Sequence, residues 1–214
     1  MVLLANLLTL LRILAIPFIM RGFFIADKFR GAEIVFWLFI LASLTDYLDG
    51  FVARKFNGSS KFGRMLDPIA DKMLVAAVLV LLAFDRQANG LPRADLIPVI
   101  IIILREILVS GLREFLALEN VAMPVTKLAK WKTTFQFLAL LALLGAPLAQ
   151  GVVVVGLPIN TQQAGQILLW LAALLTGITG WKYFRYTMRE AFKGNKILEI
   201  KMIKSDEVAG DERG

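Results

Sequence analysis

Six long apolar stretches limit the fold of this 214-residue chain more than any other feature of its sequence. They cover about residues 3–25, 32–56, 63–84, 95–118, 131–150 and 164–188. An α-helix of about 20 residues crosses the hydrocarbon core of a bilayer, and none of these stretches shows the period of two that is typical of barrel strands. The pattern therefore predicts an all-α, polytopic integral membrane protein with six transmembrane helices.

The composition agrees with this prediction, because 58% of the residues are hydrophobic and 19% are charged. Soluble domains average about 45–50% apolar and about 25% charged residues. We expect residues 1–192 to form one helical domain and the polar residues 193–214 to form a cytoplasmic tail that frays in solution. Residues 1–25 lack a small-residue cleavage site, so we interpret them as a retained helix rather than as a signal peptide.

The chain contains no cysteine and no histidine. Their absence excludes disulfides, metal sites built from thiolates or imidazoles, and nucleophilic catalysis by Ser–His or Cys–His pairs. A metal ion in this protein would need oxygen ligands, which favour hard ions such as Mg²⁺, Mn²⁺ or Ca²⁺.

The distribution of Lys and Arg predicts how the helices are oriented. If the N-terminus is cytoplasmic and the helices alternate, 17 basic residues lie on the cytoplasmic side and five lie outside. Cytoplasmic loops typically carry such an excess, so we expect both termini inside, in a bacterial inner (cytoplasmic) membrane. Attraction of this basic face to anionic lipid headgroups accounts for the net charge of +7 without a nucleic-acid partner.

Four aspartates flank the connection between the second and third apolar stretches. Asp46 and Asp49 are three residues apart, and Asp67 and Asp71 are four apart, so each pair shares one face of its helix. The short connection predicts antiparallel neighbours, which would bring the four carboxylates together at the cytoplasmic end. The loop itself, residues 55–62, holds no acid, which disfavours a merely solvated acidic loop. Mutual repulsion calls for a cation, and one or two divalent metal ions fit.

These aspartates belong to a longer pattern of eight fixed positions across 26 residues. It is written Asp46-x-x-Asp49-Gly50-x-x-Ala53-Arg54, then eight residues, then Gly63-x-x-x-Asp67-x-x-x-Asp71. The pattern resembles the signature of the CDP-alcohol phosphatidyltransferase family, and the resemblance extends over most of residues 1–190. It implies an enzyme that moves a phosphatidyl or similar group from a CDP-linked donor to an alcohol and releases CMP, with its active site at the cytoplasmic side.

The resemblance also implies roles for individual residues. Asp46, Asp49, Asp67 and Asp71 would hold the metal, two ions of Mg²⁺ or Mn²⁺, with Asp67 and Asp71 catalytic and Asp71 the base for the acceptor hydroxyl. The nucleotide pocket would be lined by Asp49, Gly50, Ala53, Arg54 and Gly63, with Arg54 toward phosphate. The small residues Gly50, Ala53 and Gly63 fit helix–helix packing equally well. The resemblance further suggests a homodimer.

A second group of residues, all basic, indicates what kind of acceptor alcohol the protein binds. Arg105 and Arg113 lie eight apart on one side of the fourth stretch, and Lys127, Lys130 and Lys132 follow. Guanidinium forks and ammonium groups suit a phosphate dianion, so we assign Arg105, Arg113, Lys127 and Lys132 to an acceptor phosphate. The alternative pairs Arg105 with Glu106 and Arg113 with Glu114, or with lipid headgroups. We disfavour those acid pairs, because adjacent helical residues do not face each other.

Further segments resemble the branch of the family that uses CDP-diacylglycerol as donor and sn-glycerol 3-phosphate as acceptor. They are residues 6–12 with Pro17, residues 66–72, residues 105–107 and 112–114, and Lys132-Thr133-Thr134 with Gln136. Asn6, Thr9 and Arg12 are candidate acceptor-side residues on this basis. The alternative for them is an interfacial helix whose arginine snorkels to lipid headgroups.

Three alternatives to this activity remain at this point. Family members with inositol-phosphate or cardiolipin-forming acceptor specificity share the aspartate pattern. An ion-coupled transporter also carries intramembrane carboxylates, but a transport path needs polar groups along its length, which we do not expect in the fifth and sixth stretches. An aspartate-rich prenyltransferase binds pyrophosphate through metal, but its pattern does not resemble the Gly, Ala and Arg positions.

Overall fold

The computed structural model describes residues 2–56, 61–85, 91–123, 127–149 and 160–211, and its regular structure there is helical. It comprises α1 (Val2–Phe23), α2 (Lys28–Phe56), α3 (Lys61–Phe84), a 3-10 helix η1 (Arg93–Asp95), α4 (Leu96–Leu118), α5 (Lys127–Gly145) and α6 (Thr161–Asp211). The prediction of an all-α chain with six helices is confirmed in the described residues.

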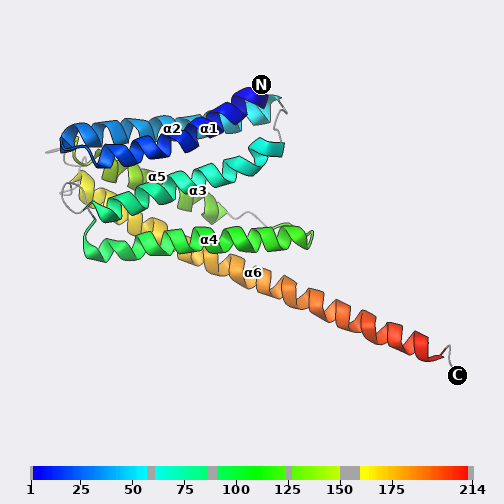
Figure 1. Cartoon of the computed structure of the whole chain (residues 1–214). Helices are drawn as coiled ribbons and strands as arrows, with labels where there is room; N and C mark the ends of the chain where they lie inside the picture. The colour runs from blue at the N-terminus through cyan, green and yellow to red at the C-terminus, as the bar shows by residue number, and fades with distance from the viewer. Residues whose placement is uncertain (1, 57–60, 86–90, 124–126, 150–159, 212–214) are drawn as a thin grey trace.

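Consecutive helices run in opposite directions along the bundle (Figure 1). The N-terminus, the end of α2 and the start of α3 lie at one end of the bundle, and α4 also ends there (Figure 1). The α1–α2, α1–α3, α4–α6 and α5–α6 pairs are in contact. This arrangement places the two halves of the aspartate pattern at the same end of the bundle, on the antiparallel helices α2 and α3, both of which pack against α1.

The helix packing follows from the apolar side chains that point inward. Phe39, Leu79, Ile102, Leu140 and Leu169 are fully buried and belong to one continuous core.

The contact between α1 and α2 is close because both helices present glycine there. A Cβ atom on Gly31 would lie 2.6 Å from the carbonyl oxygen of Gly22, closer than real contacts allow. Replacement of Gly31 by a larger residue would therefore force the first two helices apart.

The ends of α4 and α5 follow from local sequence. Asn120 has a φ of 57°, the left-handed conformation that asparagine tolerates after a helix. The Val121 and Asn120 amides donate to the Leu116 and Ala117 carbonyls, which closes α4 in a Schellman motif. Helix α5 ends at Gly145 rather than near residue 150, because Pro147 has no N–H to continue the ladder.

Helix α6 is much longer than the sequence pattern predicts. Its expected end lies near residue 188, but the helix continues to Asp211, and its C-terminal half projects away from the bundle (Figure 1). The added segment contains no proline, and Lys, Glu, Ala, Arg, Leu and Met, which form helices well, make up much of it. The tail that we expected to fray is thus helical, and its cytoplasmic location stays a prediction.

The exterior of the bundle carries many large apolar side chains. Leu14, Phe18, Trp37, Ile107 and Leu174 are each more than half exposed. Among the described residues, one helical segment, Thr161–Phe192, is long and apolar enough to cross a membrane by length and composition. Helix α4 carries two arginines and two glutamates within its 23 residues. Six membrane spans therefore stay a prediction.

Candidate active site

The backbone brings the aspartate pattern to one region of the fold. Asp46 and Asp49 lie in the last turns of α2, and Asp67 and Asp71 lie in the first half of α3. The side chains of Asp46, Asp49, Asp67 and of the nucleotide-pocket candidates Gly50, Ala53 and Arg54 lie outside the described part. Gly63 is buried. Convergence of the four carboxylates on a metal ion thus stays a prediction, and Asp71 is the member whose contacts can be followed.

Asp71 forms an ion pair with an arginine from another helix. Arg12 Nη1 donates to Asp71 Oδ1 at 2.6 Å, which joins α1 to α3 across 59 residues of sequence. The Arg12 side chain is 1% exposed, whereas that of Asp71 is 47% exposed. Arg12 therefore points into the protein, and the alternative in which it snorkels to headgroups is wrong. Thr9, one turn earlier, is also buried. The side chain of Asn6 lies outside the described residues.

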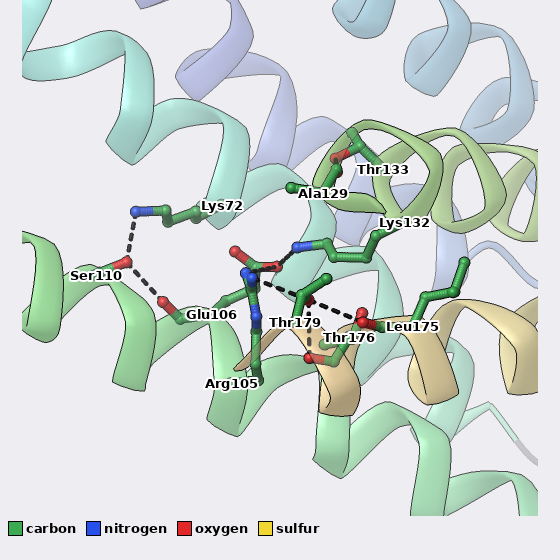
Figure 2. Close-up of polar contacts among 10 residues, drawn as sticks. All are labelled: Lys72, Arg105, Glu106, Ser110, Ala129, Lys132, Thr133, Leu175, Thr176 and Thr179. Atoms are coloured by element: carbon green, nitrogen blue, oxygen red, sulfur yellow. Dashed lines mark hydrogen bonds and ion pairs between the residues drawn. The ribbon is translucent and has the colours of Figure 1, made fainter. Parts of the chain in front are cut away.

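A second polar cluster lies between α4, α5 and α6 (Figure 2). The Lys132 ammonium group of α5 donates to Glu106 Oε1 of α4, and Arg105 Nη1 lies 3.5 Å from the same oxygen. Our argument against a contact between Arg105 and Glu106 is therefore wrong. Both side chains are long enough to bend toward the helix interface, although their Cβ atoms leave the helix in different directions.

Helix α6 completes the surroundings of Arg105. Arg105 Nη2 donates to Thr179 Oγ1 at 3.2 Å, and the Thr179 hydroxyl lies within donating distance of the Leu175 and Thr176 carbonyls, at 2.8 and 3.1 Å (Figure 2). The guanidinium carbon lies 5.5 Å from the centre of the Tyr183 ring, within the range of a cation–π contact. Arg105 Nε is buried and has no hydrogen-bond partner among the described residues.

Lys72 links this cluster to the aspartate pattern. It follows Asp71 directly in α3, and its ammonium group donates to Ser110 Oγ of α4. The Ser110 hydroxyl in turn donates to the Glu106 carbonyl at 2.6 Å (Figure 2). Lys72, Glu106 and Ser110 also line a cavity of about 280 Å³ between α3 and α4 whose other walls are aliphatic. We call Lys72, Arg105, Glu106, Ser110, Lys132 and Thr179 the basic network.

The structure selects among the bases that the sequence proposed. Arg105 and Lys132 meet at Glu106, but Arg113, two turns further along α4, is exposed. The side chain of Lys127 lies outside the described residues. Lys72, Ser110 and Thr179 were not predicted from the sequence as members of the network, and Glu106 was considered as a partner of Arg105 but disfavoured. A charged residue inside an apolar stretch was the available signal for Glu106.

One argument against a transporter also fails. We expected no polar groups along the fifth and sixth stretches, but α5 buries Lys132 and Gln136, and α6 buries Thr176, Thr179 and Thr187. Polar groups along α5 and α6 are therefore compatible with a transporter as well as with an enzyme.

The basic network carries an excess of positive charge. Lys72, Arg105 and Lys132 are cations and Glu106 is the single carboxylate among its members, so the formal balance of the network is +2. Charges buried in a medium of low dielectric need compensation. The cluster is therefore suited to an anion that carries two negative charges.

These features define a class of protein: an all-helical bundle with an apolar exterior and an excess of basic side chains between its helices. Comparison of the sequence with protein-family models matches residues 2–178 to CDP-alcohol phosphatidyltransferase. The chain belongs to the CDP-alcohol phosphatidyltransferase family, and it is an enzyme of that kind.

Several curated relatives share the name CDP-diacylglycerol–glycerol-3-phosphate 3-phosphatidyltransferase. The protein of Rickettsia felis is 44% identical over 182 residues, which cover 85% of this chain and 93% of the relative. The protein of Cereibacter sphaeroides is 40% identical, with 84% and 93% covered. The protein of Haemophilus influenzae is 36% identical, with 91% and 96% covered. The similarity therefore extends over nearly the whole of each relative.

Proposed function

We propose that this enzyme transfers the phosphatidyl group of CDP-diacylglycerol to sn-glycerol 3-phosphate, giving phosphatidylglycerophosphate and CMP. The printed names of the relatives and their coverage support the choice of both substrates. The observation that carries the proposal is the part-buried basic network, whose member Lys72 directly follows Asp71 in α3. Its balance of +2 complements the phosphate dianion that distinguishes this acceptor from a plain alcohol.

In the proposed reaction, Asp71 and the basic network have different roles. Asp71 accepts the proton of the acceptor hydroxyl as the hydroxyl oxygen forms its bond to the phosphorus of the phosphatidyl group. The bond from that phosphorus to CMP breaks, and CMP leaves. Arg105 and Lys132, together with Lys72, bind the distal phosphate of the acceptor and hold the hydroxyl toward Asp71.

A divalent metal ion is part of this proposal, with Mg²⁺ or Mn²⁺ the candidates and two ions the expected number. The donor set fits such an ion, because the candidate ligands Asp46, Asp49, Asp67 and Asp71 are all carboxylates, the oxygen ligands that these hard cations prefer. The ion would supply neutralisation of the pyrophosphate charge of the donor. Asp49, Gly50, Ala53, Arg54 and Gly63 would line the nucleotide pocket.

The setting of the reaction is a lipid bilayer. The exposed apolar side chains of the bundle support this proposal, since the donor and product are lipids. We infer that the six helices span a bacterial inner membrane with both termini and the active site on the cytoplasmic side. We also propose that the enzyme is a homodimer.

An assay of acceptor choice tests the proposal. Purified protein should release CMP from CDP-diacylglycerol when glycerol 3-phosphate and Mg²⁺ or Mn²⁺ are both present, and not when the metal is chelated. Release with inositol phosphate in place of glycerol 3-phosphate would move the assignment to another member of the family. Release with phosphatidylglycerol would identify a cardiolipin-forming enzyme, and no release with any alcohol would contradict the proposed activity.

A further inference from the structure

The contact between Arg12 and Asp71 gives α1 a part in the proposed reaction. None of the eight motif positions lies on α1, yet its arginine donates to the proposed catalytic base at 2.6 Å. The contact joins a buried group to a half-exposed one, since Arg12 is 1% exposed and Asp71 47% exposed. One oxygen of the carboxylate thus faces a fixed guanidinium while much of the side chain remains accessible.

Packing holds Arg12 in place. Thr9, on the same face of α1, is buried, as are Ile16 and Ile19 further along the helix and Ala70 beside Asp71 in α3. A buried guanidinium cannot exchange its carboxylate partner for water without a large desolvation cost. The position of Asp71 Oδ1 is therefore set by the packing of α1 against α3 rather than by Asp71 alone.

This constraint matters for chemistry at a half-exposed carboxylate. An aspartate on a helix surface rotates among staggered rotamers, which move its oxygens by several ångströms. A contact on one oxygen restricts that rotation and directs the rest of the carboxylate to a single region. Reactions that depend on orientation are sensitive to such restraint, since a misplacement of about 1 Å can cost about 100-fold in rate.

We propose that Arg12 is a positioning residue, which holds the Asp71 carboxylate in the orientation that the reaction requires. The proposal rests on the proposed function, and it replaces the assignment of Arg12 to the acceptor side. Arg12 touches neither substrate in this account and acts through Asp71.

The proposal predicts that substitution of Arg12 lowers kcat and leaves KM nearly unchanged. In Arg12→Gln, kcat should fall about 100-fold, with KM for glycerol 3-phosphate and for CDP-diacylglycerol changed less than about threefold. Arg12→Lys keeps the charge but has one ammonium group in place of the fork, so it should recover thermal stability more fully than kcat. Titration with Mn²⁺ in the absence of substrates gives a measurement that is independent of turnover. The affinity of Arg12→Gln for Mn²⁺ should be about 10-fold lower than that of the wild type, as for other partners of ligating carboxylates.

Ile19→Ala is the matched control, because it removes a fully buried side chain from the same helix without touching Asp71. At equal loss of thermal stability, Ile19→Ala should retain kcat and Mn²⁺ affinity. Equal loss of kcat in Ile19→Ala and Arg12→Gln would reduce Arg12 to a structural ion pair and overturn the proposal. A rise in KM for glycerol 3-phosphate at unchanged kcat would make Arg12 an acceptor ligand instead.

Misfolding of Arg12→Gln and inactivity of the wild-type protein are two outcomes that other measurements resolve. If Arg12→Gln does not fold, Arg12→Lys carries the test, and wild-type kcat with wild-type Mn²⁺ affinity in that variant would overturn the proposal. If the wild-type protein releases no CMP from any donor and acceptor pair, the proposed function fails. The Mn²⁺ titration of the two Arg12 variants then still tests whether Arg12 positions Asp71.

Discussion

Glu106 sets the charge balance of the basic network. Its carboxylate receives Lys132 and lies 3.5 Å from Arg105, so it offsets part of the positive charge that would bind a substrate phosphate. Without it, three cations would lie near one another at a helix interface. Glu106 thus both stabilises the network and competes with an anion for its cations.

Replacement of Glu106 by glutamine tests this balance. We expect Glu106→Gln to lose up to about 3–5 kcal/mol of stability, because removal of one partner of a buried pair leaves charge uncompensated. Glycerol 3-phosphate should then raise the melting temperature of the variant more than that of the wild type. Thermal unfolding with and without the ligand measures both effects. An equal rise in the two proteins would place the phosphate elsewhere.

Arg105 and Arg113 offer a direct comparison within one helix. Arg105 lies in the basic network, whereas Arg113 is exposed two turns away. Charge-assisted hydrogen bonds are worth about 1.5–3 kcal/mol, so Arg105→Met should raise KM for glycerol 3-phosphate roughly 10- to 100-fold. Arg113→Met should have a much smaller effect. Similar losses in the two variants would show that the phosphate contacts both arginines.

At the scale of elements, α6 packs against one side of the Arg105 side chain. Thr179 accepts from its guanidinium, and a Cβ atom on Gly180 would lie 2.8 Å from Arg105 Cγ. The absence of a side chain at Gly180 lets the stem of the arginine lie against the helix backbone. For Gly177, almost one turn earlier, the part of the chain that the structure describes has no atom within 4 Å of such a Cβ.

These two glycines form a matched pair for mutation. Gly180→Ala should displace Arg105 and raise KM for glycerol 3-phosphate several-fold. Gly177→Ala should leave KM unchanged and stabilise the helix by roughly 0.5–1 kcal/mol, because alanine loses less backbone entropy than glycine. Steady-state kinetics and thermal unfolding distinguish them. If Gly180→Ala matches Gly177→Ala in both, the close packing of α6 on Arg105 has no role in binding.

At the scale of the whole molecule, the predicted orientation in the membrane can be tested without background labelling, because the chain has no cysteine. Arg30 at the start of α2 and Glu119 at the end of α4 are both exposed. An impermeant thiol reagent applied to intact cells should label Arg30→Cys and not Glu119→Cys. After lysis it should label both. The opposite result would invert the proposed topology.

The sequence predicted local features better than the contacts between them. Apolar stretches placed six helices, and the spacing of Asp67 and Asp71 fits their place on α3. The contact of Arg12 with Asp71 joins residues 59 apart, and that of Arg105 with Thr179 joins residues 74 apart. Such contacts depend on which helices pack together, and a single sequence does not determine that. The early end of α5 had a local signal in Pro147.

The composition of the basic network has a consequence for how the protein is made. Its members come from α3, α4, α5 and α6, so no hairpin of two helices contains them all. Arg105 and Glu106 are synthesised before Lys132 and Thr179, so α4 is made before the helices that complete the network. The network is therefore complete only after α6 has packed against the bundle. A chain released before α6 is complete lacks the contacts that α6 makes with Arg105.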